Sequence, residues 1–246
     1  MKDTPGLAPL GPVKAVLFDL DDTLWPIEQV IRDAETAMHR WLQIHSPAVA
    51  ENWSIERLRA RRTILMQENP HFRVNLWAVR HAGLQEAIAE CGADPTHADG
   101  AMTVFVDARN AVTPFDDVAP GLGSLQKKFL LGSVSNGFAD LSKIGLAHHF
   151  GTSVAAYCFG RAKPDPSIFH AACDALAVKP HEAVYVGDDI DLDVIGAANA
   201  GMRTVWINRF GRALPPHAKP DAVCTDLFEL ESWLETVAGS DHSSNG

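Results

Sequence analysis

Short, continuous apolar runs bounded by glycine and aspartate occur at the start of the chain and throughout its second half. Runs in which neighbouring residues are all apolar are typical of strands buried on both faces of a parallel sheet. Helical segments separate most of these runs, as βαβ units require. We therefore predict an α/β fold with a Rossmann-like parallel sheet, whose strands lie at 13–18, 129–134, 154–158, 183–186, 204–207 and, more weakly, 222–224.

A different pattern, without a convincing strand, fills the stretch between the first two runs. Apolar residues there recur at helical spacing, first as Val30, Ala34, Ala37, Met38, Trp41 and Leu42, then as Val74, Trp77, Ala78, His81, Leu84, Ile88 and Cys91. We interpret both stripes as packed faces of helices. For Trp77 and His81 a contact with the ligand is the alternative, in which Trp77 would stack on a ring of the substrate. The sequence thus predicts an all-helical insert of about four helices at 26–112. It divides a Rossmann-like core formed by 13–25 and 113–237, with flexible tails at 1–12 and 238–246.

Composition narrows the class of protein. The hydrophobic and charged fractions, 46% and 21%, are ordinary for a globular chain. A net charge of −10 argues against a non-specific nucleic-acid binder, whose surface would be basic. The four cysteines form no Cys-x-x-Cys pair, so we expect reduced thiols rather than zinc or disulfides. No apolar run reaches the length of a membrane span, and we expect a cytoplasmic protein.

Candidate chemistry begins where the first strand ends, at Asp19-Leu-Asp21-Asp22-Thr23. An ionised carboxylate at the end of a buried strand is costly unless it is paired or binds a metal. The two carboxylates of Asp19 and Asp21 therefore favour a magnesium site with a reactive aspartate.

Three further motifs follow at or just beyond the ends of later strands. They are Ser135-Asn136-Gly137, the lysine of Gly160-Arg-Ala-Lys163-Pro-Asp-Pro, and Gly187-Asp188-Asp189-Ile-Asp191-Leu-Asp193. In open α/β sheets the binding crevice lies beyond the carboxyl ends of the strands. We therefore expect all four motifs to meet in one place.

The order and content of these motifs resemble the haloacid dehalogenase-like hydrolase superfamily over 13–24 and 114–235. That family has Asp-x-Asp-x-Thr, then Ser or Thr, then Lys, then Gly-Asp-x-x-x-x-Asp. The resemblance implies that Asp19 is the nucleophile, that Asp21 is the general acid and base, and that Ser135 and Lys163 bind the phosphoryl group.

The same resemblance implies a Mg²⁺ site made by Asp19, Asp188 and the backbone carbonyl of Asp21. The roles of Asp189 and Asp193 stay open: each either touches the metal or acts from behind the ligands, orienting a water or holding Lys163.

Substrate contacts are less well defined by the sequence. The amides of Asn136 and Gly137 are candidate donors to the phosphoryl oxygens. Trp25 either faces the substrate or packs in the core, and Arg80 could hold a second anionic group of the substrate. By contrast, a run of arginines is most simply a solvated helix face; it comprises Arg57, Arg59, Arg61 and Arg62.

The insert resembles the four-helix type of cap domain found in the superfamily. The whole chain looks most like a bacterial subgroup that includes flavin mononucleotide and phosphoribityl-pyrimidine phosphatases. We therefore expect a Mg²⁺-dependent phosphomonoesterase that forms an aspartyl-phosphate on a small phosphate ester, such as flavin mononucleotide, a nucleotide or a sugar phosphate. The presence of Asp21 argues against a dehalogenase, because a halide leaving group needs no proton.

Two alternatives remain at this point: a phosphomutase of the same superfamily, and a catalytically silent phosphate-binding regulator. We expect a small-molecule partner and neither nucleic acid nor membrane. The sequence does not decide between a monomer and a homodimer, nor does it identify the natural substrate.

Overall fold

A six-stranded parallel sheet forms the centre of the computed structural model, which describes residues 12–240 and their side chains as far as 237. The strands lie in the order β3-β2-β1-β4-β5-β6. Their bounds are β1 Ala15–Phe18, β2 Leu130–Ser135, β3 Thr152–Ala155, β4 Ala183–Gly187, β5 Arg203–Ile207 and β6 Ala222–Cys224. This arrangement confirms the predicted Rossmann-like fold. The tails predicted to be flexible lie almost entirely outside the described residues.

One predicted strand was misplaced. The segment 154–158 is strand only as far as Ala155, because a short helix, α8 (Ala156–Phe159), follows at once. Tyr157 and Phe159 of this helix are exposed, so the apolar character that favoured a strand belongs to a surface turn of helix.

The position of β1 brings the motifs together. All four of its residues are fully buried, and it pairs with β2 on one side and β4 on the other. Phe18 is in register with Ser133 of β2 and with Val186 of β4. The chain therefore leaves β1, β2 and β4 at the same edge of the sheet, where the first, second and fourth motifs follow.

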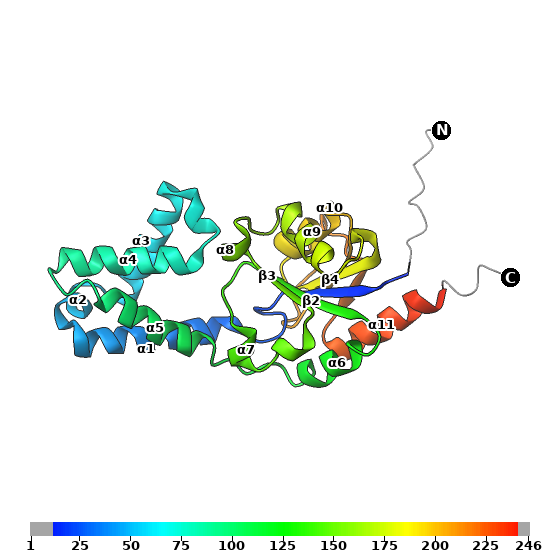
Figure 1. The fold of residues 1–246 in the computed structure, drawn as a ribbon, viewed down its shortest axis with the longest axis horizontal. Helices are drawn as coiled ribbons and strands as arrows, with labels where there is room; N and C mark the ends of the chain where they lie inside the picture. The colour runs from blue at the N-terminus through cyan, green and yellow to red at the C-terminus, as the bar shows by residue number, and fades with distance from the viewer. Residues whose placement is uncertain (1–11, 241–246) are drawn as a thin grey trace.

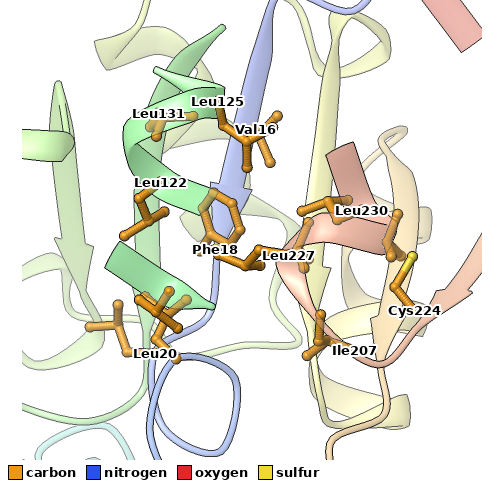
Figure 2. Close-up of a cluster of buried hydrophobic side chains, with 14 of the residues drawn as sticks. Val16, Phe18, Leu20, Leu122, Leu125, Leu131, Ile207, Cys224, Leu227 and Leu230 are labelled. Atoms are coloured by element: carbon orange, nitrogen blue, oxygen red, sulfur yellow. The ribbon is translucent and has the colours of Figure 1, made fainter. Parts of the chain in front are cut away.

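Helices cover both faces of the sheet (Figure 1). On one face, Val16 and Phe18 pack against leucines of two helices, as Figure 2 shows. On the other face, Leu17 and Tyr185 pack against Phe169. The helices of the core are α6 Val118–Leu125, α7 Leu141–Ile144, α8, α9 Pro166–Ala175, α10 Gly196–Asn199 and α11 Leu227–Ser240, with the short 3₁₀ turns η2 Ala147–His149 and η3 Pro180–Glu182 and the π-helix η4 Ile190–Ile195.

The stretch between β1 and α6 contains five α-helices rather than about four, and they form a lobe beside the sheet (Figure 1). The additional helix is α2, which is separate from α1 because Pro47 has no backbone N–H to continue α1. Their bounds are α1 Ile27–His45, α2 Pro47–Asn52, α3 Ile55–Glu68, α4 Leu76–Glu90 and α5 His97–Arg109, with a turn η1 Pro70–Arg73. All lie inside 26–112, which we continue to propose as the insert. Nowhere in residues 12–240 is a helix both long and apolar enough to cross a membrane.

The insert has a hydrophobic cluster of its own, in which Ala34, Met38 and Leu42 are buried as their spacing predicted. The same helix also buries a charge: Glu35 is fully inaccessible and accepts hydrogen bonds from Arg59 and Arg62. The arginine run is therefore not simply a solvated face, because two of its members neutralise a carboxylate that α1 carries into the interior of the insert.

Of the two interpretations of Trp77, packing in the interior of the insert is not what the structure shows. Leu84 and Ile88 of its helix are buried as predicted, but the Trp77 side chain is 37% exposed and stacks on His81. Trp77 lies in the first turn of α4, beyond the part of the stripe that other helices cover.

Replacement of Glu35 by glutamine should destabilise the insert. The change leaves Arg59 and Arg62 without the charge that compensates them, and the loss of one partner of a buried ion pair is expected to lower the free energy of unfolding by about 3 kcal/mol. Denaturant unfolding measures the change. Glu28→Gln is the matched control on the same helix, since Glu28 pairs with Arg32 at the surface. Similar small changes in the two variants would contradict a stabilising role for the buried pair.

Candidate active site

Lys163 lies at the centre of the site, with its side chain buried among acids from two other motifs. Its Nζ donates to Asp19 Oδ1 at 2.5 Å and to Asp193 Oδ1 at 2.6 Å. A third bond, at 3.0 Å, reaches the hydroxyl of Tyr185. Burial alone would lower the pKa of Lys163, but the charges of Asp19 and Asp193 hold it above its usual value. The lysine therefore stays cationic and fixes both carboxylates.

The second motif holds the backbone of this lysine in place. Asn136 Oδ1 accepts the Lys163 N–H at 2.8 Å, and Asn136 Nδ2 donates to the Lys163 carbonyl at 3.1 Å. Immediately after the lysine, Asp165 caps α9 and Pro166 occupies its first turn. Lys163 is thus anchored on one side by an amide and on the other by the start of a helix.

Gly187, at the end of β4, is required by close packing. A Cβ atom there would lie 2.3 Å from Asp193 Oδ2, which no side chain could tolerate. The same oxygen accepts the backbone N–H of Asp189 at 3.0 Å. Asp193 therefore packs directly on the backbone of its own motif while its other oxygen binds Lys163.

The carboxylates of Asp19, Asp188 and Asp193 come close enough to share a cation, with one oxygen of each within 4.8 Å of the others. Burial raises the pKa of Asp19 well above its usual value, and the Lys163 charge opposes that shift. Burial, followed by the charge of Asp193, raises the pKa of Asp188 to about 7. These hard oxygen donors and their excess of negative charge fit Mg²⁺.

Asp188 and Asp189 differ in their surroundings. Asp188 Oδ2 accepts a bond from Arg212 at 3.0 Å and faces the acidic cluster. Asp189 Oδ1 instead accepts the backbone N–H groups of Asp191 and Leu192, so it caps η4. Of the two residues left open by the sequence, Asp193 lies in the cluster, whereas Asp189 is occupied by its own turn.

Asp21 projects toward the insert rather than toward Lys163. Its Oδ1 accepts a bond from Trp25 Nε1 at 2.8 Å. Arg109 Nη2 donates to Oδ1 at 2.7 Å and to Oδ2 at 2.9 Å. Trp25 is fully buried, so its place in this conformation is the core and the Asp21 carboxylate.

Ser135 and Gly137 also lie close to Asp21, next to Arg109. The Ser135 hydroxyl is buried and accepts the Gly137 N–H at 2.9 Å. A Cβ on Gly137 would lie 2.9 Å from Asp21 Oδ2, so glycine allows the second motif to approach the acid. The Ser135 hydroxyl retains its proton for donation to a phosphoryl oxygen.

A pocket of about 340 Å³ lies between the insert and the core. None of the acids, Ser135 or Lys163 lines it, but two of its lining residues follow site residues directly in the chain: Phe138 after Gly137 and Asn110 after Arg109. Three aromatic side chains contribute to its lining, which consists of Asn75, Trp77, Val106, Asn110, Phe138, Asp140 and Tyr157.

Arg80, predicted to bind the substrate, does not line this pocket. It is buried inside the insert, with its guanidinium 4.0 Å from the Phe105 ring centroid and 3.9 Å from Glu35. Burial, together with the nearby charge of Arg62, lowers its pKa to about 9.

Sequence reasoning missed Tyr185 and Arg109. The sequence could have indicated Tyr185, since a hydroxyl in the middle of an apolar strand needs a buried hydrogen-bond partner. No sequence pattern indicates Arg109, because its contact with Asp21 joins residues 88 positions apart.

Comparison with known proteins agrees with the motifs. The family model described as haloacid dehalogenase-like hydrolase matches residues 13–201. The chain belongs to this family. Among its relatives is a glyceraldehyde 3-phosphate phosphatase of Methanopyrus kandleri, 35% identical over 206 residues that cover 80% of this chain and 84% of the relative.

Another relative of this haloacid dehalogenase-like hydrolase is the 5-amino-6-(5-phospho-D-ribitylamino)uracil phosphatase of Escherichia coli. It is 30% identical over 81% of this chain and 85% of its own length. A solved structure named 2-haloacid dehalogenase, from Pseudomonas syringae pv. Tomato, superposes with a TM-score of 0.87 and 37% identity, covering 91% and 99% of the two chains. The curated relatives are phosphatases, and the chain is a hydrolase of phosphoric monoester bonds.

Removal of the Asp188 charge should stabilise the protein without Mg²⁺ and abolish the stabilisation that Mg²⁺ provides. The folded-state pKa is raised, so the metal-free protein loses stability as pH rises from about 4 to 7 and Asp188 ionises. Asp188→Asn should therefore raise the melting temperature at pH 8 by about 4 °C in EDTA, with a smaller gain at pH 5. With Mg²⁺, only the wild type should gain further stability.

Thermal unfolding of Asp191→Asn provides the control, because Asp191 lies in the same turn of the chain with its side chain 79% exposed. Its melting temperature should change little at either pH. An unchanged response of Asp188→Asn to Mg²⁺ would show that Asp188 is not part of the metal site.

Proposed function

We propose that this enzyme is a Mg²⁺-dependent phosphomonoesterase that acts through an aspartyl-phosphate on Asp19. The observation that carries the proposal is the buried bridge from Lys163 to Asp19 and Asp193 beside Asp188. Such a cluster of charges is costly to bury, and it suits a reaction that gathers negative oxygens in one place.

In the first step, a free oxygen of Asp19 attacks phosphorus, and the bond from phosphorus to the ester oxygen breaks. Lys163 already occupies Oδ1, so we assign the attack to Oδ2. The Ser135 hydroxyl donates to a phosphoryl oxygen, and the charge of Lys163 stabilises the negative charge that builds on these oxygens.

Proton transfer belongs to Asp21 in this scheme. Its protonated carboxyl gives the proton to the departing alkoxide and then, as a carboxylate, accepts one from the water that attacks the aspartyl-phosphate. The second step releases inorganic phosphate and restores the Asp19 carboxylate, so each turnover consumes one water.

Asp19, Asp188 and the carbonyl of Asp21 would hold the Mg²⁺, with Asp193 behind them on Lys163. When bound, the ion neutralises charge on the carboxylates and on the phosphate oxygens. We also propose that the enzyme works in the cytoplasm, in keeping with its four free thiols.

The pocket supports a leaving group that carries a flat ring. Trp77 from the insert faces the same cavity as Phe138 and Tyr157 from the core. Aromatic side chains that remain exposed in a pocket offer stacking surface to planar groups. No lysine or arginine lines this pocket, whereas Asp140 does, so it does not suit a second anionic group. Flavin mononucleotide and pyrimidine nucleotides are therefore better candidates than phosphate esters whose leaving group carries a carboxylate or another anionic group.

Two other activities would fit parts of the site. A phosphomutase would use the same acids but return the phosphoryl group to another hydroxyl, giving an isomer and no free phosphate. Dehalogenation is raised by the name of the similar solved structure. It would leave Asp21 without a role, because halide departs unprotonated.

Phosphate release from a panel of monoesters, with Mg²⁺ and with EDTA, tests the proposed function. Asp19→Asn should lower turnover at least about a thousandfold, since removal of a nucleophile abolishes the covalent route. Residual activity of a tenth would rule out Asp19 as nucleophile. Isomerised sugar phosphate without free phosphate would favour the mutase, and halide release from 2-chloropropionate would favour the dehalogenase.

Trp77→Ala tests the proposed ring preference. Loss of one stacking surface should raise KM for flavin mononucleotide or a pyrimidine nucleotide about tenfold. The KM for glycerol 3-phosphate, which has no ring, should stay within about twofold. Ile64→Ala is the matched control, because Ile64 is also an exposed apolar residue of the insert but does not line the pocket. Equal KM changes for both kinds of ester would contradict the ring preference.

A further inference from the structure

Arg109 is the last residue of α5 and makes a partly buried ion pair that joins the insert to the catalytic core. Its side chain is 2% exposed, and both hydrogen bonds that it makes in the described structure go to Asp21. Arg209 shows how an arginine with a structural task differs: it bonds Asp117 and also the carbonyls of Thr23 and Thr225. The Arg109 guanidinium lies 5.9 Å from the centroid of the Phe138 ring, but its hydrogen bonds go to one group, the carboxylate that exchanges protons in the proposed reaction.

Asp21 is held from both chain segments that connect the insert to the core. Trp25 comes immediately before the first helix of the insert, and Arg109 ends its last helix. Trp25 Nε1 and Arg109 Nη2 both donate to Oδ1, whereas Oδ2 receives only the longer bond from Arg109. With two lone pairs on each oxygen, Oδ1 is fully used and Oδ2 keeps one free.

The oxygen that keeps a free lone pair is also the one next to the second motif, at Gly137. Oδ2 lies against Gly137, whose N–H is bonded to the Ser135 hydroxyl. Arginine is always charged and has no acceptor, so Arg109 can orient the carboxyl without taking its proton.

We propose that Arg109 is a positioning residue, which aligns Asp21 Oδ2 with the leaving-group oxygen only when α5 is seated on the core. This inference rests on the proposed phosphatase reaction. It adds that the insert controls proton transfer as well as access, because movement of either connecting segment would release one of the donors that orient Asp21.

The test compares kcat/KM for two esters whose leaving groups differ in their need for a proton. Flavin mononucleotide releases an alkoxide that must be protonated, whereas p-nitrophenyl phosphate releases a stable phenolate. A general acid contributes roughly 10²–10⁴-fold. Arg109→Met should therefore lower kcat/KM about a hundredfold for flavin mononucleotide, and about threefold or less for p-nitrophenyl phosphate.

Arg109→Lys keeps the charge but not the fork of donors, so it should recover part of the flavin mononucleotide activity while the selective loss persists. If Arg109→Met does not fold, the Arg109→Lys variant alone tests the positioning role. Lys143→Met is the matched control: it removes the ion pair between Lys143 and Asp107, an exposed contact between core and insert. This variant should leave the ratio of the two kcat/KM values unchanged.

Equal losses on both esters, or no loss on either, in a folded Arg109 variant would overturn the positioning role and leave the phosphatase function standing. Absence of phosphate release by the wild type from either ester, with Mg²⁺ present, would overturn the proposed function and the role of Arg109 with it.

Discussion

The bridge from Lys163 to Asp19 and Asp193 is the interaction on which the site depends. A lysine and two carboxylates buried together are stable only if each charge finds its partner at hydrogen-bond distance. That requirement explains the neighbouring features: the amide of Asn136 fixes the backbone of the lysine, Tyr185 offers it a third acceptor, and helix α9 begins directly after it. The sheet supplies the rest by placing β1 between β2 and β4.

The parts of the fold that were predictable are those in which short segments of sequence decide the structure. A short apolar run such as 13–18 that ends at an aspartate is typical of a buried strand, and motifs that follow parallel strands converge at one edge. The unpredicted parts depend on contacts between distant helices. Glu35 looks like any surface glutamate until α3 brings Arg59 and Arg62 against it. Likewise, no spacing rule connects Arg109 with Asp21.

Helical periodicity also has a limit at the ends of helices. The stripe on α4 correctly placed Leu84 and Ile88, but it could not show that the first turn of the helix extends past the other helices of the insert. Trp77 consequently faces the cavity next to the core. Helical periodicity thus assigns Trp77 to packing, although it lies where a substrate would meet the insert. Only the arrangement of the insert and the core distinguishes packing from substrate contact.

The contact between Gly187 and Asp193 has a consequence for how this sequence can diverge. Because a methyl group at 187 and the present carboxylate at 193 would occupy the same space, a side chain at 187 requires a change at Asp193. A descendant could acquire a larger residue at 187 only after Asp193 had shortened or moved, and that earlier step would leave Lys163 with one carboxylate fewer. Every series of single substitutions that leads to a larger residue at 187 therefore includes a variant with a damaged site. The two positions are constrained in this way even though neither is the proposed nucleophile.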